Sequence, residues 1–532
     1  MTQPLLTVTN LQLSFAQQQV IKGIDFKIYP GETFALVGES GSGKSLAALS
    51  VLRLHPTQAN LQADTIQLAE VDILRTPEAE LCQVRGRRVA MIFQDPMSSL
   101  NPVMSIGQQI AESIRIHFSV SKAQCTKKVL ALLQQVGIPD AQRRINEYPH
   151  QLSGGQRQRI MIAIALAGEP ELLIADEPTT ALDVTIQAQI LQLLQNIQRQ
   201  NGMALWLISH DLALVSTMAD RVAVMQAGHI VETADNKQIF SQPEHAYTQK
   251  LLKALPDINY RAEQVKPDAD ILLKVSDFKV HYPIRKGLFK RVVGQVKAVD
   301  GVSFSLEAGK TLALVGESGC GKTTLGKGLL NLIPVTSGQV DFAGVNLATL
   351  THEQLRLQRA AMQIIFQDPF AAMNPRMLIL DIIAEGLRTL HPEVANADVI
   401  ATVTNLLEKV GLSDSALYRY PHEFSGGQRQ RICIARALAV KPKLIVCDEP
   451  TSALDVSVQK QIIELLKSVQ KTDYISYLFI THDLAVVAEI ADQVAVMYQG
   501  EIVEYGAVNQ VLKHAEHAYT KKLLSAVPVL QR

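Results

Sequence analysis

Two copies of one glycine-rich segment supply the residues of this chain that are best suited to bind phosphate. The first copy is GESGSGKS at residues 38–45, and the second is GESGCGKT at residues 316–323. Both fit the spacing G-x-x-x-x-G-K-[S/T], in which backbone N–H groups surround phosphate oxygens, the lysine contacts the β- and γ-phosphates and the last hydroxyl binds Mg²⁺. A glycine-rich turn with a chance lysine is the alternative, and the second copy disfavours it.

An apolar strand pattern precedes each copy, at residues 33–37 and 311–315, and a helical pattern follows it. This is the context that such a phosphate loop requires. The N-terminus of the following helix adds a field that favours anions. The residues predicted to bind ATP in the two loops are Gly38, Glu39, Ser40, Gly41, Ser42, Gly43, Lys44 and Ser45, and Gly316, Glu317, Ser318, Gly319, Cys320, Gly321, Lys322 and Thr323.

Two further strand patterns each end in a pair of acids. The runs ELLIADE at residues 171–177 and KLIVCDE at residues 443–449 are apolar up to those acids, as expected of parallel strands buried on both faces. Because ligands bind at the carboxyl ends of such strands, we predict that the first acid binds Mg²⁺ together with the loop hydroxyl. The second acid is suited to polarise the attacking water. A lone acid pair could instead cap a helix, but a phosphate loop precedes both pairs. The predicted magnesium ligands are Ser45, Thr323, Asp176 and Asp448, and the predicted bases are Glu177 and Glu449.

A histidine follows each of two more strand patterns, at residues 203–209 and 476–481. A histidine in this position is more often structural, but the same His-Asp-Leu-Ala sequence follows both strands and favours a sensor of the γ-phosphate. Matching FQDP segments carry an uncharged glutamine that can contact Mg²⁺ or the attacking water, a weak assignment when taken alone. The predicted sensors are His210 and His482, and the predicted metal or water contacts are Gln94 and Gln367.

These motifs repeat in the same order along the chain, so the chain is an internal duplication. Positions 44 and 322, 177 and 449, and 210 and 482 correspond. The repeat is far longer than the 20–50 residues of a solenoid unit and therefore indicates two domains. A polar stretch with two prolines lies between them and is typical of a linker. We predict a first domain at residues 1–256, a linker at 257–270 and a second domain at 271–532.

Composition excludes several classes of protein. Lys plus Arg number 51 and Asp plus Glu number 51, so no overall basic charge favours nucleic acid. No apolar run approaches the ~18 residues that a membrane span needs, and the first residues lack the pattern of a signal peptide. Five cysteines occur without a C-x-x-C pair, which indicates neither a disulfide framework nor a zinc ribbon. We expect a cytoplasmic, soluble protein that reaches a membrane only through a partner.

The segments LSGGQRQR at 152–159 and FSGGQRQR at 424–431 resemble the signature motif of ATP-binding cassette (ABC) ATPases. The glutamines, the histidines and the Ala-Leu-Asp segments at 181–183 and 453–455 match that family too. The resemblance implies an α/β fold with two tandem P-loop NTPase domains. Each domain would have a RecA-like parallel-sheet core, an antiparallel β subdomain and a helical signature subdomain. From the residues alone, the serine of each signature is typical of a helix N-cap.

In this family the halves pack head to tail, and each signature closes over the ATP of the other half. One composite site would combine Lys44, Ser45, Gln94, Asp176, Glu177 and His210 with Ser425, Gly426, Gly427 and Gln428. The other would combine Lys322, Thr323, Gln367, Asp448, Glu449 and His482 with Ser153, Gly154, Gly155 and Gln156. Both keep the glutamate and the histidine, so we predict two competent sites.

Phe15 and Tyr282 align when the strands before them are matched, and they resemble the aromatic that stacks on adenine in this family. A buried core aromatic is the alternative. The second half carries an extra basic stretch at residues 283–297, which favours a solvated hairpin over contact with phospholipid or a partner.

The segment HYPIRKGLFK at 281–290 and the EHAYT-containing tails at 243–256 and 515–528 resemble ATPases of the oligopeptide, dipeptide and nickel importer subfamily. The fused microcin C and oligopeptide importer ATPases of Gram-negative bacteria are the most similar. This resemblance implies an ATPase that energises peptide import from the cytoplasmic face of the inner membrane, with ATP and Mg²⁺ as cofactors. Nickel and other small solutes remain possible cargoes.

The same resemblance implies two integral-membrane permease subunits as partners and, through them, a substrate-binding protein, with no nucleic acid. Residues 95–107 and 368–382, after the FQDP glutamines, would help to form grooves for permease helices. Some relatives bind an iron–sulfur cluster through cysteines near such tails. No cysteine here lies beyond Cys447 or between Cys125 and Cys320, so we expect no cluster.

A tandem ABC ATPase that acts on the ribosome as a translation factor is the alternative class. The short linker and the neutral net charge disfavour it. A DNA-repair ABC ATPase would be expected to show zinc cysteines. One local expectation concerns Cys320: loop amides and Lys322 could lower its thiol pKa and make it sensitive to alkylation. A small, inert residue that fills the loop is the equal alternative.

Overall fold

The computed structural model describes residues 3–16, 18–180, 182–255, 270–286, 291–452 and 454–527. The chain divides into two compact units. The first holds nearly all described residues up to Leu255, and the second holds those from Asp270 to Val527; we call them the first and second halves. The predicted linker at 257–270 lies, except for Asp270, outside the described residues, as do Ala181 and Ala453.

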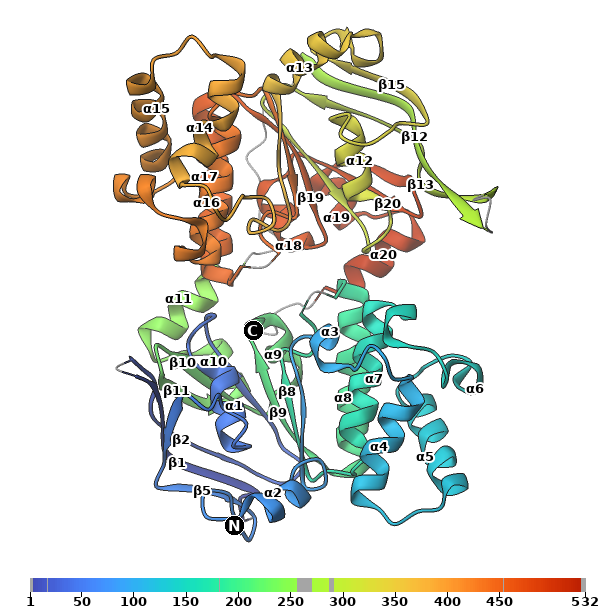
Figure 1. The fold of residues 1–532 in the computed structure, drawn as a ribbon, viewed down its shortest axis with the longest axis vertical. Coiled ribbons are helices and arrows are strands. Elements are labelled where there is room, and N and C mark those ends of the chain that lie inside the picture. Colours follow the sequence, from blue (N-terminus) through green and yellow to red (C-terminus); the bar gives the residue numbers. More distant parts are fainter. Residues whose placement is uncertain are drawn as a thin grey trace. The chain divides into compact units, whose positions relative to one another are not determined.

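A six-stranded sheet forms the centre of the first half (Figure 1), with the strand order β11-β10-β3-β9-β8-β7. Five strands are parallel, and β11 runs antiparallel to β10. Because both faces are covered, β3 and β9 are buried at every position. The bounds are β3 Thr33–Val37, β7 Val89–Ile92, β8 Leu172–Asp176, β9 Ala204–Ser209, β10 Arg221–Gln226 and β11 His229–Asp235.

An antiparallel sheet of β2-β1-β5-β6, with β4 also paired to β1, lies against one face of the central sheet. Helix α1 (Lys44–Val51), which follows the first phosphate loop, packs between the two sheets through Ala47, Ala48 and Val51. The bounds are β1 Leu6–Phe15, β2 Gln18–Ile28, β4 Ala59–Gln62, β5 Thr65–Leu68, β6 Val71–Asp72 and α2 Glu78–Val84.

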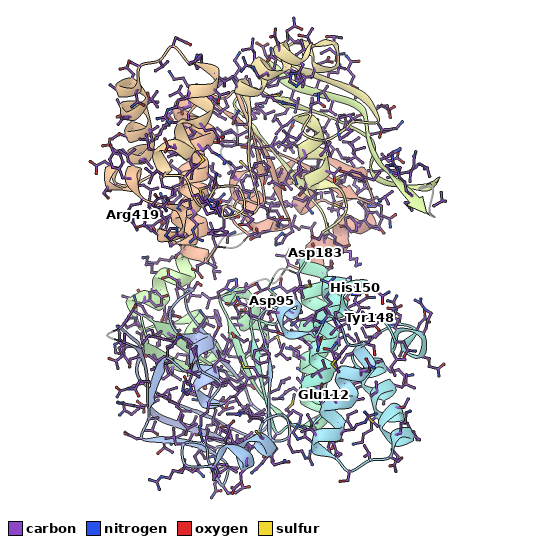
Figure 2. The ribbon with its side chains drawn as sticks, in the orientation of Figure 1. Asp95, Glu112, Tyr148, His150, Asp183 and Arg419 are labelled. Atoms are coloured by element: carbon purple, nitrogen blue, oxygen red, sulfur yellow. The ribbon has the colours of Figure 1, made fainter. Side chains whose placement is uncertain are left out.

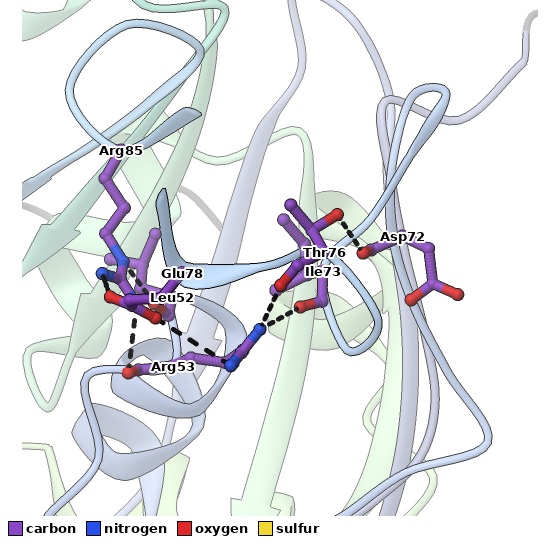
Figure 3. A network of polar contacts seen from close by, with 7 residues as sticks. All are labelled: Leu52, Arg53, Asp72, Ile73, Thr76, Glu78 and Arg85. Atoms are coloured by element: carbon purple, nitrogen blue, oxygen red, sulfur yellow. Dashed lines mark hydrogen bonds and ion pairs between the residues drawn. The ribbon is translucent and has the colours of Figure 1, made fainter. Parts of the chain in front are cut away.

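A polar network fastens α2 to the end of α1 (Figure 3). Arg85 donates from Nε to the Leu52 carbonyl at 2.8 Å and from Nη1 to Glu78 at 2.5 Å. Arg53 donates to the carbonyls of Ile73 and Thr76 at 3.2 and 2.6 Å. These guanidinium groups satisfy carbonyls at the C-terminal end of α1 and in the loop after β6.

Helices cover the other face of the central sheet and share a second apolar core with it. This region contains the longest helices of the first half, α4, α5, α7 and α8 (Figure 1). The bounds are α3 Pro96–Ser99, α4 Ile106–His117, α5 Lys122–Gln135, α6 Ala141–Arg144, η1 Pro149–Gln151, α7 Gly154–Leu166, α8 Val184–Asn201, α9 Leu212–Met218, α10 Asn236–Ser241 and α11 Ala246–Ala254.

The second half repeats this architecture, with the strand order β21-β20-β14-β19-β18-β17 in its central sheet and β13-β12-β15-β16 in its antiparallel sheet. The strands are β12 Ile271–Lys286, β13 Arg291–Glu307, β14 Thr311–Val315, β15 Ser337–Phe342, β16 Val345–Asn346, β17 Met362–Ile365, β18 Leu444–Asp448, β19 Ser476–Thr481, β20 Gln493–Tyr498 and β21 Glu501–Ala507. The helices are α12 Lys322–Leu329, η2 Leu347–Thr349, α13 His352–Ala361, α14 Ile379–Leu390, α15 Asn396–Lys409, η3 Asp414–Tyr418, η4 Pro421–Glu423, α16 Gly426–Leu438, α17 Val456–Asp473, α18 Leu484–Ile490, α19 Val508–Lys513 and α20 Ala518–Ser525.

The fold class predicted from the sequence is confirmed: each half combines a mainly parallel core, an antiparallel sheet and a helical region. The extra basic stretch of the second half lengthens β12 and β13 to 16 and 17 residues, against 10 and 11 in β1 and β2. These strands pair as a hairpin, and its segment 287–290 lies outside the described residues. Within the described residues, no helix has the length and apolar character to cross a bilayer.

Candidate functional site

Each phosphate loop connects a central strand to the helix between the two sheets. Gly43 and Gly321 precede α1 and α12 with φ of 107° and 111°, in the left-handed region that favours glycine. A Cβ on Gly316 would lie 2.2 Å from the carbonyl oxygen of Met497, so only glycine fits at the start of the loop. The loops therefore have the tight backbone that lets amides approach a phosphate.

The lysine of each loop curls back into the loop. Lys322 Nζ donates to the carbonyl oxygens of Gly316 and Glu317 at 2.7 and 3.0 Å. Lys44 makes the same pair of bonds at 2.8 Å each. Both lysines are buried. Each ammonium group is thus held inside the loop that is predicted to surround the phosphates.

The loop hydroxyl meets the predicted magnesium-binding carboxylate in both halves. Ser45 Oγ donates to Asp176 Oδ1 at 2.9 Å, and Thr323 Oγ1 donates to Asp448 Oδ1 at 2.8 Å. Burial raises the pKa of Asp176 to about 6 and also raises the pKa of Asp448. A hydroxyl beside a buried carboxylate is an oxygen-only donor set, which suits Mg²⁺. These four residues fit the predicted metal.

The second acid of each strand end accepts hydrogen bonds from the predicted glutamine and histidine. Glu177 accepts from Gln94 Nε2 at 2.7 Å and from His210 Nδ1 at 3.0 Å. Burial raises the pKa of Glu177, but the hydrogen bond and charge of His210 outweigh it and lower the pKa to about 2. The ionised carboxylate can orient a water and accept its proton.

The second half repeats this trio. Glu449 accepts from Gln367 Nε2 at 3.0 Å, and His482 Nδ1 lies 3.5 Å from its Oε1. Burial raises the pKa of Glu449, while His482 lowers it, with a net lowering. Both glutamates have a left-handed backbone, with φ of 46° at Glu177 and 47° at Glu449. Such a conformation is uncommon for a residue other than glycine and is concentrated at functional sites.

The signature serines cap helices, as predicted. Ser153 Oγ accepts from the Gln156 N–H at 3.3 Å, and the Gln156 side chain accepts from the Ser153 N–H at 3.1 Å. Ser425 and Gln428 form the same capping box at 3.4 and 3.0 Å. The signatures thus lie at the exposed N-termini of α7 and α16, in the helical region of each half.

The signature glycines allow close helix packing. A Cβ on Gly155 would lie 2.6 Å from Ile186 of α8, and one on Gly427 would lie 2.5 Å from Val458 of α17. The first glycines, Gly154 and Gly426, are exposed. Packing therefore explains the second glycine of each signature, whereas the first leaves backbone open to solvent.

The two predicted adenine-stacking aromatics differ in exposure. Phe15 ends β1 and is partly packed against the core of the antiparallel sheet, so both alternatives stand for it. Tyr282 lies on β12 and is 41% exposed. A buried core role is thereby excluded for Tyr282.

The expectation of a lowered pKa at Cys320 is wrong. The side chain is buried, and burial raises the pKa of the Cys320 thiol by more than the charge of Lys322 lowers it. The thiol lies 3.9 Å from Lys322 Nζ, at the place where the first half has Ser42. Its environment supports the alternative of a small residue that fills the loop.

One contact of each phosphate loop was not expected from the sequence. The Glu317 N–H donates to the Tyr519 hydroxyl at 2.9 Å, and the Glu39 N–H donates to the Tyr247 hydroxyl at 3.3 Å. These tyrosines belong to the two EHAYT segments. The occurrence of the EHAYT segment in both halves was the only sign of it in the sequence. That repetition indicated a family resemblance and not a contact with the phosphate loop.

Comparisons with known proteins find family matches in both halves. The family model described as "ABC transporter" matches residues 21–180 and 299–452. The model "Oligopeptide/dipeptide transporter, C-terminal region" matches residues 231–279 and 503–532, which include both tyrosines. The solved structure titled "Dimeric structure of a post-hydrolysis state of the ATP-binding cassette MJ0796 bound to ADP and Pi" aligns with 44% of this chain and 98% of its own, at 25% identity and a TM-score of 0.40.

Two curated relatives match almost the whole chain. The peptidoglycan transport ATP-binding protein YejF of Agrobacterium fabrum is 48% identical over 99% of this chain and 96% of its own length. The glutathione import ATP-binding protein GsiA of Escherichia coli K12 is 47% identical over 99% of this chain and 90% of its own. The translation-factor alternative finds no support in these comparisons. The chain belongs to the ABC transporter family, as a tandem ATPase whose ATP hydrolysis is coupled to transport.

Proposed function

We propose that this chain binds MgATP in both halves and that hydrolysis drives the import of peptides across the inner membrane. One observation carries the proposal: both halves bring together the same hydroxyl–aspartate pair and the same glutamine–glutamate–histidine trio. If these residues had only a structural role, the complete set would not need to occur in both halves. The proposed domain bounds remain 1–256 and 271–532, with a linker between them.

The chemistry divides between the residues of each half. The loop amides and the lysine bind the phosphates, and the hydroxyl–aspartate pair holds Mg²⁺, which neutralises charge on the β- and γ-phosphates. The glutamate accepts a proton from the attacking water, the glutamine holds that carboxylate, and the histidine senses the γ-phosphate. Tyr282 and Phe15 stack on adenine.

The signature of each half binds the γ-phosphate held by the other half. Support comes from the exposed helix N-terminus, where a capping box orders Ser153 or Ser425 and the first glycine leaves backbone N–H groups accessible. ATP then joins the halves because both contact one phosphate, and hydrolysis removes that link. The two composite sites are both competent, since each keeps its glutamate and histidine.

Peptides are the proposed cargo class. The relatives' names specify peptidoglycan transport and glutathione import, and the C-terminal model is that of oligopeptide and dipeptide transporters. The chain supplies the ATPase domains. The cargo is therefore selected by two permease subunits and a substrate-binding protein. The chain works at the cytoplasmic face of the membrane, attached through those permeases.

The segments after the FQDP glutamines are the proposed permease-binding surfaces. In the first half, Met97 and Val103 are exposed apolar residues, 60% and 79% accessible. Figure 2 shows Asp95, Tyr148 and His150 near α3 and α7 in the same region. Asp95 caps α3 by accepting from the Met97 N–H at 2.7 Å, which orders this segment.

An arginine of each signature helix contacts the same surface. Arg157 Nη1 lies 2.7 Å from Met97 Sδ, and the Arg429 guanidinium lies 5.1 Å from the Phe370 ring centroid. Phe370 is 48% exposed in the corresponding segment of the second half. A permease helix that displaces these apolar side chains would therefore move an arginine of the signature itself. This contact gives a route from the membrane subunits to the ATP site.

Affinity purification of the tagged chain from its native cells in mild detergent tests the proposal. Two polytopic permeases should co-purify, and peptides should stimulate the ATPase once the binding protein is added. Recovery of ribosomes without membrane proteins would contradict it.

A further inference from the structure

A buried tyrosine of each EHAYT segment contacts the phosphate loop of its own half. Tyr519 is 7% exposed, and its hydroxyl accepts from the Glu317 N–H at 2.9 Å. The Gly316 carbonyl belongs to the same peptide group as that N–H, and it accepts from Lys322 Nζ at 2.7 Å. One peptide plane is thus held by the tyrosine at one end and by the phosphate-binding lysine at the other.

The first half has the same arrangement with a longer bond. The Glu39 N–H donates to the Tyr247 hydroxyl at 3.3 Å, and Lys44 Nζ donates to the Gly38 carbonyl at 2.8 Å. Because a peptide group is planar, fixing its N–H direction also fixes the direction of its carbonyl. The tyrosine therefore determines where the carbonyl that holds the lysine points.

The surrounding residues hold the tyrosine in place. Glu504 of β21 accepts from the N–H groups of Glu516 and His517 at 2.8 and 3.2 Å, which fixes the start of α20. His517 Nδ1 accepts from the Tyr519 N–H at 3.2 Å. The Tyr519 ring packs against Tyr498 with ring centroids 4.3 Å apart. These contacts set both the position and the ring orientation of Tyr519.

The first half repeats the hydrogen-bonded supports. Glu232 of β11 accepts from the N–H groups of Glu244 and His245 at 2.8 and 3.1 Å and from the Thr248 hydroxyl. His245 Nδ1 accepts from the Tyr247 N–H at 3.2 Å. The same residue types form the contact between tyrosine and phosphate loop in both halves. This contact is therefore a feature of the EHAYT segment.

We propose that Tyr519 and Tyr247 are positioning residues that set the phosphate-binding loop and its lysine for MgATP, and that this is a function of the C-terminal region of each half. The inference rests on the proposed nucleotide-binding role of the loops. It means that the C-terminal region, which is characteristic of oligopeptide and dipeptide transporters, influences the affinity for ATP. The shorter bond assigns the larger contribution to Tyr519.

The test measures MgATP binding to one half at a time. In a Lys44→Ala parent, MgATP binding reports the second half, and Tyr519→Phe then removes the hydroxyl while keeping the ring against Tyr498. A neutral hydrogen bond of ordinary strength predicts MgATP affinity about 3- to 10-fold weaker. The maximal hydrolysis rate at saturating ATP should change less than the KM, because the reacting groups are untouched.

Tyr505→Phe is the matched control. Its hydroxyl lies in the same C-terminal region and contacts the Ser305 carbonyl and Gln493 at 3.0 Å each, away from the loop. The control should lower thermal stability about as much as Tyr519→Phe and leave MgATP affinity unchanged. Tyr247→Phe in a Lys322→Ala parent should weaken binding in the same direction but less.

Equal MgATP affinity in the Tyr519→Phe variant and its parent would overturn the inference while leaving the proposed function intact. An equal loss of affinity in Tyr505→Phe would also overturn it, because a general loss of stability would then explain both. A Lys44→Ala parent that binds no MgATP would overturn the proposed nucleotide site and the inference with it.

Discussion

The Gln94 side chain donates a hydrogen bond to the Glu177 carboxylate at 2.7 Å, although 82 residues separate them in the chain. Gln367 and Glu449 repeat the bond at 3.0 Å. The glutamine leads directly into the proposed permease-binding segment, and the glutamate is the proposed base. A shift of that segment would therefore change the hydrogen bonding of the base, which is a physical way to couple permease movement to hydrolysis.

Replacing both proposed bases should stop hydrolysis and preserve binding. In Glu177→Gln/Glu449→Gln, neither side chain can accept a proton from water, so turnover should fall at least about 100-fold. Loops, lysines and hydroxyls are unchanged, so MgATP should still bind. Steady-state ATPase assays and nucleotide binding measure the two effects. Glu112→Gln, at an exposed residue of α4 in the first half (Figure 2), is the control and should hydrolyse ATP normally. Undiminished turnover of the double variant would remove both glutamates from the base role.

The network at the end of α1 should contribute measurably to stability (Figure 3). Arg85 bonds to the Leu52 carbonyl and to Glu78 with a side chain that is 18% exposed. Hydrogen bonds from a charged donor predict that Arg85→Ala lowers the free energy of unfolding of the first half by about 2 kcal/mol. Arg75→Ala is the control, because its ion pair with Asp72 is 3.5 Å long and the arginine is 90% exposed. Arg75→Ala should lower the free energy of unfolding by less than about 0.5 kcal/mol. Denaturant unfolding measures both, and equal effects would show that the network adds nothing beyond a surface pair.

A charge on the proposed permease-binding surface should uncouple transport from hydrolysis. Phe370→Asp replaces the exposed ring beside Arg429 with a carboxylate, so a permease helix would lose an apolar contact. Peptide uptake should be lost while basal ATPase activity stays near the wild-type rate. Leu357→Asp, at an exposed apolar residue of α13, provides the control and should transport normally. Normal uptake by Phe370→Asp would place the permease contact elsewhere.

Cysteine labelling should follow burial. Cys82 is exposed, whereas burial raises the pKa of the Cys320 thiol, which lowers its thiolate fraction at any given pH. Iodoacetamide at neutral pH should label Cys82 first and Cys320 slowly, and a higher pH should speed the second reaction. Mass spectrometry of tryptic peptides over time measures both rates. Faster labelling of Cys320 than of Cys82 would contradict the buried, protonated thiol.

The strands and loops were predictable because local patterns determine them. Thr33–Val37, Thr311–Val315 and Ser476–Thr481 are β3, β14 and β19 with the bounds that their apolar runs indicated. Strands β8, β9 and β18 each begin one residue later than their runs, at Leu172, Ala204 and Leu444. The signature N-caps were predictable for the same reason, since a capping box depends on residues three apart.

Contacts between distant residues and the effects of burial were not predictable. The bond between Glu317 and Tyr519 joins two segments that the sequence gives no reason to pair. The left-handed backbone at Glu177 depends on how the strand end meets the rest of the site. For Cys320, the nearby lysine and amides were visible in the sequence, but the degree of burial that decides the direction of the pKa shift was not.

The number of ATP molecules bound per chain tests most directly whether both halves hold a competent site. Equilibrium dialysis of the purified Glu177→Gln/Glu449→Gln protein with labelled ATP and Mg²⁺ avoids turnover during the measurement. We predict two ATP molecules per chain, and one after either Lys44→Ala or Lys322→Ala is added. A single bound ATP in the double glutamine variant would contradict two competent sites.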